Sequence, residues 1–146
     1  MRWRADTGPT SFPLTPIPAQ DTMKQIIDTG LPRSAAPVEW AVLGNGILFT
    51  TQIPTGTDGN VVEGGMEAQA RQTLQNLKQT LDAAGGSLAD LTQVIVYVTD
   101  RADLAVFNRV YAEMIPAPYP NRAAIVTVGF GRPEMLVEIL AYAALG

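Results

Sequence analysis

The run Thr92-Gln93-Val94-Ile95-Val96-Tyr97-Val98 decides the layers of the fold, because its apolar side chains fall on both faces of an extended chain. Successive side chains of a strand point to opposite faces. A strand that is apolar on both faces needs cover on both faces. We therefore expect a strand here, with helices on one side and a neighbouring subunit on the other.

Two amphipathic segments flank this run. The first follows Gly64-Gly65 and stops at Gly85-Gly86, and the second follows the N-cap candidate Asp100 and stops at Pro116, which cannot continue a helix. Each has an apolar stripe at helical spacing: Met66, Ala70, Leu74, Leu77, Leu81 and Ala84, then Leu104, Phe107, Val110, Tyr111 and Met114. Two such helices cover one face of a sheet, so assembly into a homo-oligomer is the simplest cover for the other face.

Short apolar or alternating segments predict the remaining strands. They are residues 24–28, 38–42, 47–53, 122–128 and 136–145, with a tight hairpin at Gly44-Asn45-Gly46. The predicted order is strand, strand, strand, helix, strand, helix, strand, strand. Parallel pairing across each helix, with hairpins at the ends, would give a mixed α+β sheet with both helices on one face. Residues 1–22, rich in Pro and Thr, are interpreted as an N-terminal extension and residues 23–146 as one domain.

Composition excludes several functions. Among 146 residues there is no cysteine and no histidine, which removes disulfides, thiolate nucleophiles, the usual general base and the commonest metal ligands. The net charge is −4 and no basic block occurs, so nucleic-acid binding is disfavoured. No apolar run is long enough to cross a bilayer or to act as a signal peptide. We expect a soluble, cytoplasmic protein without a metal.

The stretch from Pro116 to Val126 supplies the main site candidate. Pro116, Pro118 and Pro120 restrict the backbone that leads to Arg122, at the start of an apolar strand. A guanidinium on a stiff support presents a planar fork of donors to a carboxylate or phosphate. Arg122 is therefore predicted to anchor an anion. The structural alternative is an arginine paired with Glu138 or with a backbone carbonyl.

Several further motifs occur in a fixed order. They are Gly44-Asn45 with Ile47–Pro54, Gln69–Leu77, Ala83–Gly86, Val96–Asp100, Phe107–Tyr111, Pro120–Ala123 and Val137–Ile139. Taken together, over residues 23–144, the chain resembles the Rid family of reactive intermediate deaminases, also called the YjgF or endoribonuclease L-PSP family.

The resemblance implies a chorismate-mutase-like fold assembled as a trimer, with clefts between subunits. It also implies hydrolysis of reactive enamines and imines, such as 2-aminoacrylate, to keto acids and ammonia, with no metal or organic cofactor. Arg122 matches the family's arginine that binds the substrate carboxylate.

The chain departs from the family pattern at several positions. Leu140 takes the place of a last-strand glutamate that positions water, and Glu138 matches the preceding acidic position on the same face. Ala124 replaces a frequent cysteine, and Thr50-Thr51 replaces Ser-Gly. The entrance tyrosine has no clean counterpart, with Trp40 the nearest aromatic residue. These departures suggest a substrate other than 2-aminoacrylate, such as a longer unsaturated amino acid.

The site residues predicted from the sequence are thus Arg122, Glu138, Thr51, Tyr97, Trp40 and Leu140. Most of them, like Arg122, also have a structural interpretation. Glu138 would be a polar residue satisfied at the subunit boundary, Tyr97 and Trp40 would be packing residues, and Thr51 would satisfy a backbone group. The favoured function is an enamine or imine deaminase. The alternative is a non-catalytic module that binds 2-keto acids or related small carboxylates. A ribonuclease fits poorly with an acidic chain that lacks histidine.

Overall fold

The computed structural model describes Gly8 and residues 24–146, so the predicted extension over residues 1–22 lies, apart from Gly8, outside the described residues. The elements in chain order are β1 (Gln25–Ile26), β2 (Ala41–Gly44), β3 (Ile47–Gln52), α1 (Gly65–Ala83), η1 (Leu88–Asp90), β4 (Leu91–Val98), η2 (Arg101–Asp103), α2 (Leu104–Met114), β5 (Asn121–Val126) and β6 (Val137–Ala144). This confirms the predicted order, with η1 and η2 added as short 3-10 turns. The strand expected over residues 38–42 begins only at Ala41, because residues 35–37 and Trp40 form bends.

The sheet is mixed, as predicted, but its strand order corrects the predicted pairing. The order is β1-β2-β3-β6-β4-β5, in which β4 and β5 are parallel and the other neighbours antiparallel. Parallel pairing across a helix therefore holds only for α2. The expected hairpin of β5 with β6 is wrong: β6 lies between β3 and β4. Its inward side chains Val137, Ile139, Ala141 and Ala143 are all buried, which suits a central strand.

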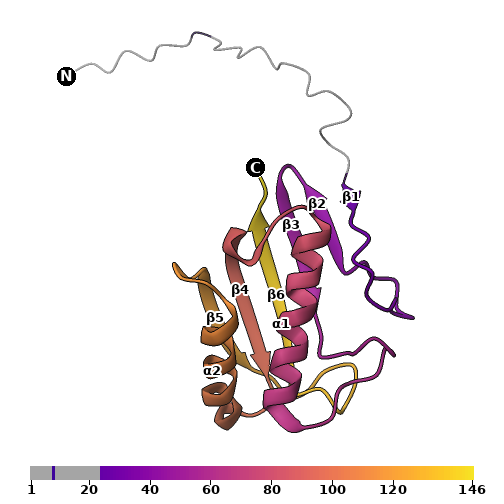
Figure 1. Cartoon of the computed structure of the whole chain (residues 1–146), viewed down its shortest axis with the longest axis vertical. Coiled ribbons are helices and arrows are strands. Elements are labelled where there is room, and N and C mark those ends of the chain that lie inside the picture. Colours follow the sequence, from indigo (N-terminus) through magenta and orange to yellow (C-terminus); the bar gives the residue numbers. More distant parts are fainter. Residues whose placement is uncertain (1–7, 9–23) are drawn as a thin grey trace, which may run out of the picture.

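Both helices lie against the same face of the sheet (Figure 1). On that face Val94, Val96 and Val98 of β4 are fully buried beneath the predicted apolar stripes of α1 and α2. The start of α1 depends on glycine: Gly64 has a φ of 115°, and a Cβ there would lie 2.9 Å from the Cβ of Ala68. No helix in the described part of the chain is long and apolar enough to span a membrane.

No helix of the described residues lies on the opposite face of the sheet. This face presents Ile47 and Phe49 of β3 and Ile125 of β5, which are 42%, 45% and 42% exposed. Half-buried Leu140 and Tyr142 of β6 lie between them. We refer to this surface as the open face. The strand β5 is exposed along most of its length, so residues 24–146 leave both one face and one edge of the sheet uncovered.

Candidate functional site

A cavity of about 420 Å³ brings together three of the six predicted site residues. Trp40, Thr51 and Glu138 line it, together with Arg132 and Met135 of the loop between β5 and β6. Thr51 and Glu138 belong to neighbouring strands and both point to the open face, because the buried residues of β3 and β6 alternate with them. The cavity therefore opens at one end of this face, where β6 begins.

The Trp40 side of the cavity is held by backbone hydrogen bonds. The indole Nε1 of Trp40 donates to the carbonyl of Pro32 at 2.9 Å. The hydroxyl of Thr50 and the backbone N–H of Thr51 donate to the carbonyl of Trp40, at 2.5 and 3.3 Å. Thr50 is itself buried, and its hydroxyl accepts from Gln52. Trp40 and Thr51 are consequently fixed relative to each other.

Glu138 has the electrostatic character expected of a functional carboxylate. Burial raises the pKa of its carboxyl above the ordinary value, because the charged form loses contact with water. Its side chain makes no hydrogen bond or ion pair with any residue that the structure describes. Titratable groups with displaced pKa values in cavities are candidates for acid–base roles. The cavity therefore contains a carboxyl group that has no partner among the described residues.

Arg122 lies on the other side of the sheet. In the parallel ladder it pairs with Val94, whose side chain faces the helices, whereas Tyr97 pairs with Glu138 and faces the open side. The guanidinium of Arg122 donates to Oδ1 of Asn108 at 2.5 Å. Its hydrogen-bond partner is thus on α2, and Glu138 of the same protomer projects from the opposite face.

Aromatic rings of α2 support Arg122. Its Cζ lies 4.8 Å from the ring centre of Tyr111 and 5.8 Å from that of Phe107. Stacking on ring faces stabilises a cation and restricts the side chain. No carboxylate among the described residues forms an ion pair with Arg122, so its charge is free to bind an external anion at the β5 edge.

The other two predicted residues lie near the cavity on the open face. Leu140 pairs with Thr51 across β3 and β6, and both line a neighbouring cavity of about 290 Å³. Tyr97 pairs with Glu138 but lines neither cavity. The chain therefore gathers all the predicted site residues except Arg122 around one end of the open face.

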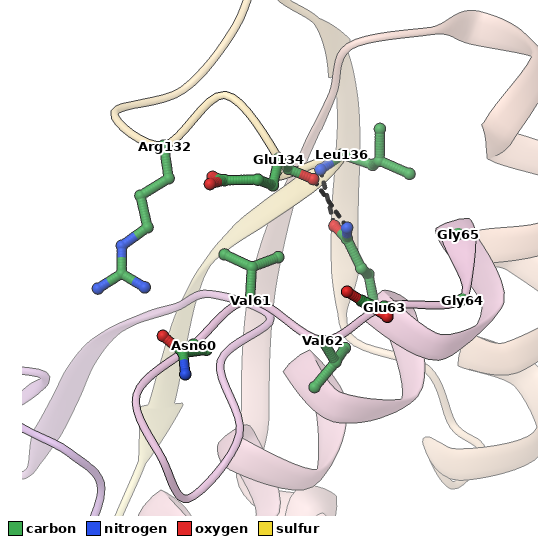
Figure 2. A pocket seen from close by; sticks show the side chains of 10 residues that line it. Asn60, Val61, Val62, Glu63, Gly64, Gly65, Arg132, Glu134 and Leu136 are labelled. Atoms are coloured by element: carbon green, nitrogen blue, oxygen red, sulfur yellow. Dashed lines mark hydrogen bonds between the residues drawn. The ribbon is translucent and has the colours of Figure 1, made fainter.

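Sequence reasoning did not identify Arg132 as a site residue. Arg132 lines the cavity with Glu138 and also a second cavity of about 490 Å³, at the start of α1 (Figure 2). The second cavity contains none of the predicted site residues. The only available signal was an arginine between Gly131 and Pro133, which resembles an ordinary turn.

Sequence reasoning also assigned no role to Gln69, which holds the Arg132 loop in place. Its Nε2 donates to the carbonyl of Glu134 at 2.9 Å, and its Oε1 accepts from the N–H of Leu136 at 2.7 Å. The dashed lines in Figure 2 mark these bonds. Gln69 is only 4% exposed. It therefore connects α1 to the segment that leads from Arg132 to Glu138.

Comparisons with known proteins agree on one family. Residues 31–145 match the family model described as endoribonuclease L-PSP. A RutC family protein of Pyrococcus horikoshii is 38% identical, over 83% of this chain and 98% of its own length. The mitochondrial protein mmf1 of Schizosaccharomyces pombe is 38% identical, over 73% of this chain and 67% of its own length. Because that relative is mitochondrial, the cytoplasmic location of this chain stays a prediction.

A solved structure gives the same result for the fold. The crystal structure of TdcF from E. coli with bound serine matches with a TM-score of 0.77 and 30% identity, over 84% of this chain and 99% of that one. The expected α+β fold is thereby confirmed.

Proposed function

The chain belongs to the endoribonuclease L-PSP family, which includes the Rid proteins. From this membership we propose that it hydrolyses a small carboxylate-bearing enamine or imine to a keto acid and ammonia. One observation carries the proposal. Arg122 and Glu138 project from opposite faces of the same sheet, so a site that uses both takes them from two protomers. Such a site lies in a cleft between subunits.

We further propose that the protein assembles as a homotrimer. The open face exposes Ile47, Phe49 and Ile125, and the edge strand β5 is uncovered. A soluble monomer rarely leaves a contiguous apolar surface of this kind in water. In a cyclic assembly the β5 edge of one protomer can approach the open face of the next, which brings Arg122 toward the cavity that holds Glu138.

In the proposed reaction Arg122 binds the carboxylate of the substrate and holds the neighbouring imine carbon beside Glu138. Glu138 accepts a proton from water while the water oxygen forms a bond to that carbon. Glu138 passes this proton to the nitrogen, which gives a carbinolamine. Transfer of the hydroxyl proton to the nitrogen through Glu138 then lets the C–N bond break, and ammonia leaves as the C=O bond forms. An enamine would enter this sequence as its imine tautomer. Thr51 is placed to hold either the water or the substrate. Positioning and charge are sufficient for such a reaction, because these imines also hydrolyse unaided.

A second function, binding without turnover, has two observations in its favour. TdcF of E. coli, a protein of the same fold, was crystallised with serine, a carboxylate ligand. In addition, because position 140 is a leucine, Glu138 is the one carboxylate that β6 carries. We keep a module that binds 2-keto acids as the alternative, because it would use Arg122 in the same way.

Subunit mixing tests the proposal directly. Arg122→Ala and Glu138→Gln should each abolish ammonia release from freshly generated 2-aminoacrylate or 2-aminomuconate. When the two variants are unfolded together at equal amounts and refolded, a mixed trimer contains a site with both native residues. Random mixing should restore roughly a quarter of the wild-type sites.

The control is the Arg122→Ala variant refolded alone, which should stay inactive. No recovery in the mixture, with mixed trimers present by mass, would mean that Arg122 and Glu138 do not act across a subunit boundary. Saturable binding of 2-oxobutyrate by wild-type protein that releases no ammonia would favour the binding module.

A further inference from the structure

Arg132 provides a cation that the reaction described above does not use. It lies in the same cavity as Glu138, Thr51 and Trp40, although it belongs to the loop between β5 and β6. The cavity of about 420 Å³ is within the range of pockets that hold drug-sized ligands, about 300–1,000 Å³.

Hydrogen bonds hold both the guanidinium and the backbone of Arg132. Its Nη1 donates to the carbonyl of Gly59 at 2.7 Å, which ties the guanidinium to the connection between β3 and α1. Hydrogen bonds also hold its backbone. The carbonyl of Arg132 accepts from the N–H of Met135 at 3.2 Å, and the side chain of Gln69 bonds to the backbone of Glu134 and Leu136. An arginine that is held in this way loses less freedom when it binds an anion.

The charge of Arg132 is not neutralised within the described residues. Arg71 and Arg109 form ion pairs with Glu67 and Glu113, whereas Arg132 forms none. Its remaining N–H donors are available, because only Nη1 has an acceptor there. Two carboxyl groups, of Glu39 and Glu138, also line the cavity. Neither of them forms an ion pair with Arg132 among the described residues.

From this arrangement we propose that the substrate carries a second carboxylate, which Arg132 binds. This inference rests on the proposed function and names its substrate class: enamines or imines of dicarboxylic acids. Arg122 of the neighbouring protomer would bind the carboxylate next to the reacting carbon. Arg132 would bind the carboxylate at the far end, with Trp40 and Met135 along the apolar wall between them.

The test measures binding of stable keto acids, so that it does not depend on turnover. Isothermal titration of the assembled wild-type protein compares 2-oxoglutarate, a dicarboxylate, with 2-oxobutyrate, a monocarboxylate. We expect the dicarboxylate to bind about tenfold tighter, the size of one charge-assisted hydrogen bond. Arg132→Met should remove this preference and leave 2-oxobutyrate binding unchanged.

Two further variants complete the design. Arg132→Lys keeps the charge without the planar fork and should retain part of the preference. Arg101→Met, at an exposed arginine on η2, is the matched control and should change neither affinity. Equal wild-type affinities, or equal losses for both acids in Arg132→Met, would overturn the inference.

The outcomes separate this inference from the proposed function. A dicarboxylate preference without ammonia release from any imine would leave the Arg132 subsite standing and reject the reaction. Ammonia release from 2-aminoacrylate, with no preference between the two acids, would support the reaction and reject the subsite.

Discussion

Replacing Gln69 with methionine should destabilise the protein far more than the same substitution does at an exposed glutamine of a helix. The side chain is 4% exposed and bonded to two backbone groups of the β5–β6 connection, the carbonyl of Glu134 and the N–H of Leu136. Methionine keeps the length and volume of glutamine but can make neither bond. A buried backbone group left without a partner costs about 1–3 kcal/mol. Glu134 is exposed and its carbonyl can turn to water, so we expect a loss of about 2–3 kcal/mol.

Urea denaturation followed by circular dichroism measures this loss as a lower transition midpoint at unchanged slope. The matched control is Gln75→Met on the same helix, where the side chain is exposed and makes no hydrogen bond to a described residue. That variant should stay within about 0.5 kcal/mol of wild type. If Gln69→Met costs no more than its control, the two hydrogen bonds do not hold the loop and the reasoning fails.

Four further perturbations follow from the site and the sheet. Burial holds the pKa of the Glu138 carboxyl above its value in the unfolded chain, so the unfolding free energy should fall as the pH rises from the unfolded-state pKa to the folded-state pKa of this group. Thermal melts at a series of pH values should show this fall for the wild type and not for Glu138→Gln. Leu140→Glu should create or raise ammonia release from 2-aminoacrylate; no change would mean that this position does not select the substrate. Tyr111→Phe should raise the unfolding free energy by about 1 kcal/mol, because its hydroxyl is buried without a partner among the described residues. Phe49→Glu should lower the mass measured by light scattering to that of a monomer, and an unchanged mass would place the interface elsewhere.

Local patterns were sufficient to predict the elements of this fold. The stripe from Met66 to Ala84 and the glycines at each end predicted α1 to within about a residue, because helix ends and buried faces depend on nearby residues. The place of β6 could not be predicted in the same way. Its pairing with β3 and β4 depends on contacts between distant segments, and a chain-order hairpin with β5 satisfies the local pattern equally well.

The candidate site was predictable to a similar extent. Thr51, Glu138 and Trp40 were found through motifs that lie on regular strands or beside them, and the structure places them around one cavity. Arg132 was missed because a loop arginine next to glycine and proline has no periodic pattern. The role of Gln69 was hidden for another reason: its partners are backbone atoms far along the chain, which a side-chain pattern does not reveal.

The alternation of side chains along the strands places Arg122 and Glu138 on opposite faces of the sheet. Arg122 faces the helices because it pairs with Val94, and Glu138 faces the open side because it pairs with Tyr97. A shift of β5 by one residue would turn Arg122 to the open side and place Ala123 against α2. The observed register instead rests Arg122 on Tyr111 and Phe107, which support its charge at the edge of the sheet. An arginine so placed lies at the edge of the sheet, and the proposed site would take it from one subunit and Glu138 from the next.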